Sequence, residues 1–102
     1  MDNIIKSGRV KKLHPKGLQK IWKRVLLKLT PEGLSYYTLP YQNLIGTIPL
    51  EQVSQVDTSD DVLIVRIGQE EPRYQHFRID DQYELNHWFT IINDMLPINP
   101  EI

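Results

Sequence analysis

The sequence contains no cysteine. Disulfide bonds, zinc–thiolate sites and thiol nucleophiles are therefore excluded together. Long apolar runs are absent too. The longest uninterrupted ones are residues 25–27 and 62–65, whereas a membrane-spanning helix needs about 20 apolar residues. The first twelve residues lack the apolar segment of a secretory signal, so we expect a cytoplasmic protein.

Basic residues are scarce after residue 30. Nine of the twelve Lys and Arg lie before that point, where the only acid is Asp2, whereas residues 31–102 carry three Arg and twelve acids. The formal net charge of −1 thus hides a first third of +8 and a remainder of −9. A small protein with one cationic end is suited to docking on an anionic, phosphate-rich surface.

Motifs of catalysis and metal binding are also missing. His14, His76 and His87 show no ligand spacing, and no glycine-rich phosphate loop or nucleophile motif occurs. We therefore expect no enzyme, metal site or cofactor. With 102 residues, 40% of them hydrophobic, the chain is expected to form a single domain over residues 1–102, with its core at about 4–96 and a tail at 97–102.

Alternating apolar and polar residues predict a series of short strands. Residues 20–29 place Val25, Leu27 and Leu29 on one face, which indicates a strand with an apolar inner side. The turn at residues 30–33 has Pro second and Gly fourth, so residues 34–39 should return antiparallel. The other expected strands are residues 4–13, 44–50, 52–57, 62–67 and 74–79. The first should end at the loop 14–17, because that loop contains a Pro and a Gly.

A helical period follows the strands. Apolar residues recur at spacings of three and four, at Leu85, Trp88, Ile92 and Met95. Asp81 and Glu84 have the spacing of a capping box, and Pro97 should end the helix after residue 96. The sequence thus predicts a mainly β fold, a seven-stranded antiparallel barrel or sandwich capped by one C-terminal helix.

This order of elements resembles the pleckstrin-homology domain. Segments that resemble its first four strands are residues 5–12, 22–29, 34–37 and 46–50, and residues 77–79 followed by Trp88 resemble its last strand and helix. The resemblance implies a non-catalytic membrane-targeting or adaptor module that binds phosphoinositide or other anionic lipid head groups through its first two strands.

The resemblance also implies which side chains bind the head group. They are Lys12, Lys23 and Tyr37, and the charge of the loop between the first two strands adds Lys16 and Lys20. Two positions depart from the family pattern, because Val25 stands where an Arg is expected and Ile45 where a basic residue is expected before Gly46. Val has no hydrogen-bond donor, so we expect modest affinity.

Other hypotheses remain open at this stage. Strand parity places Lys11, Trp22 and Arg24 on the outer side of the first two strands, where they could form an alternative lipid site. The chain could instead be a protein–protein interaction domain with little lipid binding. Tyr36 and Tyr37 point to opposite faces, so one should pack and the other stay available. We expect no nucleic-acid partner, a monomeric domain and peripheral membrane association.

Overall fold

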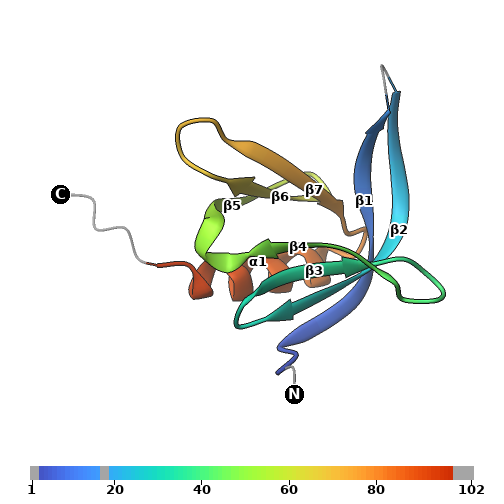
Figure 1. Cartoon of the computed structure of the whole chain (residues 1–102), viewed down its shortest axis with the longest axis horizontal. Coiled ribbons are helices and arrows are strands. Elements are labelled where there is room, and N and C mark those ends of the chain that lie inside the picture. The colour runs from blue at the N-terminus through green and yellow to red at the C-terminus, as the bar shows by residue number, and fades with distance from the viewer. Residues whose placement is uncertain (1–2, 17–18, 98–102) are drawn as a thin grey trace.

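A computed structural model of the chain describes residues 3–16 and 19–97. Its strands form a single antiparallel sheet in the order β4-β3-β2-β1-β7-β6-β5, with one C-terminal helix (Figure 1). This confirms the predicted fold class. The elements are β1 (Lys6–Lys16), β2 (Gln19–Thr30), β3 (Gly33–Tyr37), β4 (Leu44–Pro49), a 3-10 turn (Leu50–Gln52), β5 (Val53–Ser59), β6 (Val62–Ile67), β7 (Arg73–Arg78) and α1 (Gln82–Met95).

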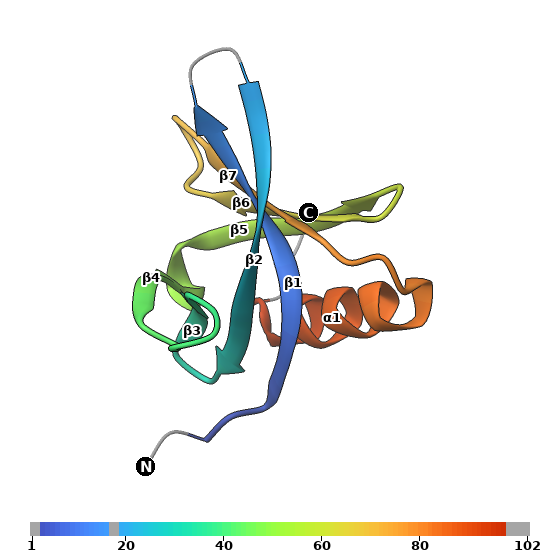
Figure 2. The ribbon, with the colours of Figure 1, turned by 90° about the vertical axis from the view of Figure 1, so that its right-hand side faces the viewer.

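Strand β1 joins the two halves of the sheet. It pairs with β2 along its whole length, from Lys6 opposite Leu29 to Lys16 opposite Gln19. It pairs with β7 at two positions, where Lys11 and Lys12 meet Arg78 and Phe77. Beyond Lys12, β1 has β2 alone as a neighbour, and Figure 2 shows the paired strands rising away from the other elements. Lys12 therefore lies at the rim of the folded sheet.

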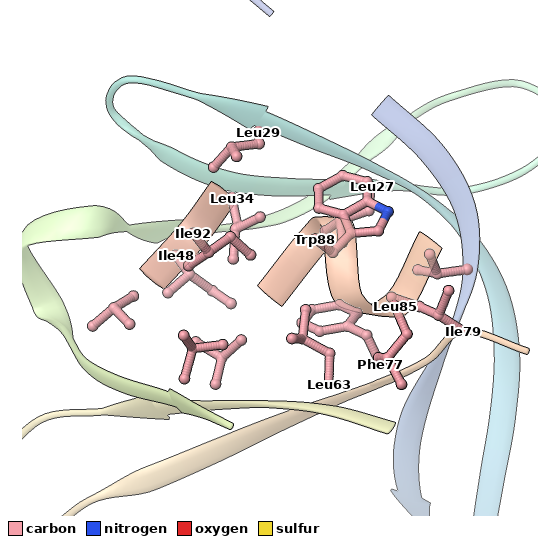
Figure 3. Close-up of a cluster of buried hydrophobic side chains, with 14 of the residues drawn as sticks. Leu27, Leu29, Leu34, Ile48, Leu63, Phe77, Ile79, Leu85, Trp88 and Ile92 are labelled. Carbon is pink, nitrogen blue, oxygen red and sulfur yellow. The ribbon is translucent and has the colours of Figure 1, made fainter. Parts of the chain in front are cut away.

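The core fills the space between the two halves of the sheet and α1. Trp88 is 2% exposed, and it belongs to one apolar cluster with Leu27 and Phe77, both fully buried (Figure 3). The indole lies against the backbone of β1, because a Cβ placed on Gly8 would be 3.6 Å from Cζ2 of Trp88. This side chain therefore connects the helix to the central strand.

The ends of α1 agree in part with the predicted signals. Asp81 caps the helix and accepts hydrogen bonds from the backbone N–H groups of Tyr83 and Glu84, at 2.9 and 3.2 Å. The reciprocal half of the capping box was wrong, because the Glu84 carboxylate accepts a hydrogen bond from Lys6 Nζ at 2.6 Å. Met95 is partly buried, so the buried helix stripe consists of Leu85, Trp88 and Ile92.

Some predicted strand limits need correction. Strand β1 continues to Lys16, past the Pro15 expected to end it. Pro is tolerated on an edge strand because the side without a neighbour needs no N–H donor, and β1 has no β7 partner at this level. Strand β3 ends at Tyr37 instead of residue 39, whereas the limits of β6 match the prediction. Of the expected tail at residues 97–102, residues 98–102 lie outside the described residues.

We expect Trp88→Ala to destabilise the protein by about 3–5 kcal/mol, because it removes a buried aromatic ring and leaves a cavity. Urea denaturation followed by circular dichroism measures this free energy of unfolding. Tyr83→Ala on the same helix is the control, since Tyr83 is 79% exposed and its loss should change stability by about 0.5 kcal/mol or less. Equal losses in the two variants would contradict this account of the core.

Candidate anion-binding site

A cavity of about 400 Å³ opens between the β1–β2 pair and the β3–β4 connection. Its basic lining residues are Lys12, His14, Lys23 and Arg24, and no acidic side chain lines it. We call this cavity the basic mouth. A second depression beside β1 and α1 and a third beside β5 are both lined by acidic side chains as well. Among the described residues, the basic mouth is therefore the cavity best suited to an anion.

Strand register explains why two lysines reach the mouth. Lys12 lies directly opposite Lys23, as Val10 lies opposite Val25. Residues two apart on a strand share a face, so the lysines continue the face that buries both valines in the core. The lysines follow these valines at the point where β1 leaves β7, so their side chains leave the core and reach the cavity.

Lys12 is a half-buried cation without a carboxylate partner in the described part of the chain. Its ammonium group lies 5.1 Å from the centre of the Tyr36 ring and donates a long hydrogen bond of 3.4 Å to the Leu13 carbonyl oxygen. Burial lowers the pKa of Lys12, because a charged group loses hydration there. An anion placed in the mouth would compensate this cost.

The aromatic residue beside Lys12 is Tyr36, and the structure does not bring the predicted Tyr37 to the mouth. Tyr36 pairs with buried Leu27 and therefore lies on the inner face. It has room because its partner is Gly46, where a Cβ would approach the Tyr36 hydroxyl to 2.5 Å. Tyr37 lies on the opposite face, with Lys28 Nζ 4.7 Å from its ring centre.

The remaining predicted inner residues divide into two groups. Lys20 is exposed on β2, opposite Pro15 and beyond the mouth. Lys16 ends β1, and its side chain lies outside the described residues. Sequence reasoning did not place His14 or Arg24 at this cavity. The register of β1 against β2 puts His14 on the face of Lys12, but β1 was expected to stop before His14. Arg24 lies opposite Lys11 on the other face and lines depressions on both sides of the strand pair, which register alone does not indicate.

The alternative outer site is partly neutralised by acids. Lys11 lies opposite Arg24 in the β1–β2 pair, and Trp22 is two residues before Arg24 on β2. The three predicted residues therefore share a face. The depression beside Lys11 and Arg24 is also lined by Asp80, Asp81 and Glu84, and Trp22 does not line it. Lys11 Nζ lies 3.9 Å from Asp80. This arrangement favours the basic mouth for an anion.

Arg78 adds a further ion pair on the outer face. Its Nε donates a hydrogen bond of 2.8 Å to Asp61 and lies 3.4 Å from Asp80. The hydrogen bond from Arg78 lowers the pKa of Asp61. Lys11 and Arg78 on this side are therefore already close to protein carboxylates.

The two departures from the family pattern occupy different places. Val25 lines the floor of the mouth and is 3% exposed, so it belongs to the core. Ile45 lines the wall and is 49% exposed. At position 25 the expected donor is therefore replaced by a side chain of the core, and at position 45 by an apolar side chain that is open to solvent.

Within residues 3–16 and 19–97, no cluster of three or more His, Asp or Glu side chains is arranged to hold a metal ion. The same ranges contain no helix with the length and hydrophobicity needed to cross a bilayer.

Solved structures with a similar fold include several PH domains. The N-terminal PH domain of human ARAP2 is 29% identical, with a TM-score of 0.70 over 89% of this chain and 77% of that one. The C-terminal PH domain of pleckstrin, in complex with an inositol pentakisphosphate, is 23% identical, with a TM-score of 0.76 over 92% of this chain and 99% of that one. The chain has the pleckstrin-homology (PH) fold.

A third PH domain shows how far sequence diverges on this fold. The PH domain of Slm1, in complex with D-myo-inositol 4-phosphate, is 15% identical, with a TM-score of 0.76 over 93% of this chain and 97% of that one. No protein-family model and no curated protein sequence matches this chain. Its membership of the fold therefore rests on three-dimensional structure.

The pKa of His76 is affected by the lysines at the basic end of the chain. Its pKa is lowered by burial and then by the charges of Lys20 and Lys12. Because the folded pKa is below the unfolded value of about 6.5, this group destabilises the fold as the pH falls through that value and has no effect well above it.

We expect Lys12→Gln/Lys20→Gln to raise the His76 pKa, as measured by NMR titration. An unchanged pKa would show that burial alone causes the shift.

Proposed function

We propose that this PH domain is a non-catalytic, peripheral membrane module whose basic mouth binds the head group of a phosphoinositide or another anionic lipid. The observation that carries the proposal is Lys12, a half-buried ammonium group directed into a cavity that contains two more fixed positive charges and no carboxylate. Phosphate groups fit such a site because they accept several charge-assisted hydrogen bonds from Lys and Arg.

The chemistry of similar structures supports this choice of ligand. Pleckstrin's C-terminal PH domain and the Slm1 PH domain were each solved with an inositol phosphate. Domains of this fold act as binding modules, and we propose the same role, at a cytoplasmic membrane surface, for this chain. Val25 supplies no donor, and a hydrogen bond to a charged group contributes about 1.5–3 kcal/mol, so we expect the affinity for a free head group to be modest.

Electrostatic attraction to the membrane has a limited strength. A basic residue near an anionic leaflet contributes about 1 kcal/mol. Lys12, Lys20, Lys23 and Arg24 together would therefore contribute about 4 kcal/mol, which corresponds to a Kd of about 1 mM. Charge alone can assist the association of this domain with a membrane but cannot hold it there.

We expect Lys12→Gln/Lys23→Gln to weaken binding to vesicles that carry phosphatidylinositol bisphosphate by about 30-fold, because two contributions of about 1 kcal/mol are lost. Vesicle co-sedimentation at physiological salt measures the effect. The matched control is Lys28→Gln/Arg73→Gln, which changes net charge equally at positions that do not line the mouth. Equal losses in the two double variants would indicate attraction by net charge and contradict a site at the mouth.

We expect Lys11→Gln to leave vesicle binding nearly unchanged, since Lys11 faces Asp80 on the outer side. A loss as large as that of the double variant, in the same sedimentation experiment, would move the site to the outer face. If the unmodified domain binds no acidic vesicle and no soluble inositol phosphate, the lipid proposal is wrong and a protein partner becomes the leading hypothesis.

A further inference from the structure

The connection between β3 and β4 and the first two residues of β4 present apolar side chains to solvent next to the basic mouth. Tyr41 is 84% exposed, Leu44 is 60% exposed and Ile45 is 49% exposed. We call these three residues the apolar corner. Ile45 also lines the mouth, as does Leu39 on the other side of the connection. The apolar corner and the cationic cavity are therefore parts of one continuous surface.

The backbone holds this corner in place. The Thr38 N–H donates to the Asn43 carbonyl at 2.8 Å, and the Gln42 N–H donates back to the Thr38 carbonyl at 2.9 Å. The Asn43 N–H also donates to the Thr38 hydroxyl at 3.0 Å. Gln42 adopts a left-handed conformation, with φ of 57°, which is uncommon for a residue other than glycine. Because three hydrogen bonds fix the turn, the exposure of Tyr41 and Leu44 is a property of the folded structure.

We propose that the apolar corner inserts into the bilayer beneath the lipid head group that the basic mouth holds, with Tyr41 and Leu44 as the inserting residues. This inference rests on the proposed function. A bilayer offers phosphates at its surface and hydrocarbon just below, and amphipathic tyrosine is favoured at that boundary. The basic mouth would face the phosphates, and the apolar corner would face the hydrocarbon below them.

Charge distinguishes a bilayer from a second copy of the chain. The cavity next to the corner carries Lys12, Lys23 and Arg24 and no acid. Two copies docked through their corners would bring these like charges together, which costs free energy. An anionic bilayer instead attracts the same charges while burying the same apolar surface. Burial of the apolar corner would add to the free energy of membrane binding, which electrostatic attraction alone leaves weak.

The test compares two double variants of the full chain. Tyr41→Ser/Leu44→Ser should bind phosphatidylcholine vesicles containing phosphatidylinositol bisphosphate at least about 10-fold more weakly, because apolar burial is lost. Its affinity for soluble inositol hexakisphosphate, measured by calorimetry, should be unchanged. The control Tyr74→Ser/Tyr83→Ser removes two side chains that are 52% and 79% exposed elsewhere, and should bind vesicles as the unmodified protein does.

A label reports insertion directly. The chain has no cysteine, so Tyr41→Cys introduces a single attachment site for an environment-sensitive fluorophore. We expect its emission to shift to the blue when vesicles are added, and the emission of the same label at Tyr83→Cys to stay constant. Labelling tests the corner even if the serine variant folds poorly.

The outcomes separate the two proposals. Unchanged vesicle binding by Tyr41→Ser/Leu44→Ser, or an unshifted label at position 41, overturns the insertion while leaving head-group binding at the mouth intact. A dimer in sedimentation without lipid that Tyr41→Ser/Leu44→Ser converts to a monomer overturns it in favour of a second copy. If the unmodified protein binds neither vesicles nor inositol hexakisphosphate, both proposals fail together.

Discussion

The contact of β1 with β7 is the constraint on which the rest of the structure depends. It consists of two residue pairs, Lys11 with Arg78 and Lys12 with Phe77. These pairs join the sheet half that contains β2–β4 to the half that contains β5–β7, and α1 packs Trp88 into the space between them. Since β1 leaves β7 immediately after Lys12, the same contact closes the core and sets the position of the rim. The basic mouth therefore lies where β1 loses β7 as its neighbour.

Burial and charge are coupled at this rim. Phe77 is fully buried, and its neighbour across the strands is the half-buried Lys12. A cation held so close to an apolar core is expensive unless a counter-charge approaches it. On the outer face, Lys11 and Arg78 have such counter-charges in Asp80 and Asp61. Positive charge on the outer face is thus paired within the protein, whereas Lys12 on the inner face has no carboxylate partner among the described residues.

Much of the fold could be predicted because local and periodic signals agree. The Pro and Gly of the turn after β2, the alternation of Val25, Leu27 and Leu29, and the Asp81 cap each depend on neighbouring residues. The end of β1 could not be predicted in the same way. Pro15 is tolerated within a strand because β7 is absent beside it, and that fact depends on the packing of distant segments.

The candidate site shows the same limit. Lys12 and Lys23 were identified from the family resemblance and do line one cavity. The choice of Tyr37 over Tyr36 followed the resemblance, although counting back from the turn, where Thr30 pairs with Gly33, puts Tyr36 opposite Leu27 on the inner face. The position of Ile45, exposed at the edge of the mouth, could not be predicted from the sequence, since an apolar residue in a predicted strand is ordinarily assigned to the core.

The one-sided pairing of β1 beyond Lys12 has a consequence for dynamics. Backbone groups in this part of the hairpin have a neighbouring strand on one side only, so they can open without disturbing the core. Their amide protons can therefore exchange with solvent through local fluctuations, whereas those of the strands around Trp88 require global unfolding. One wall of the mouth thus belongs to a part of the sheet that can open locally, and a bound anion would slow the exchange of its amide protons.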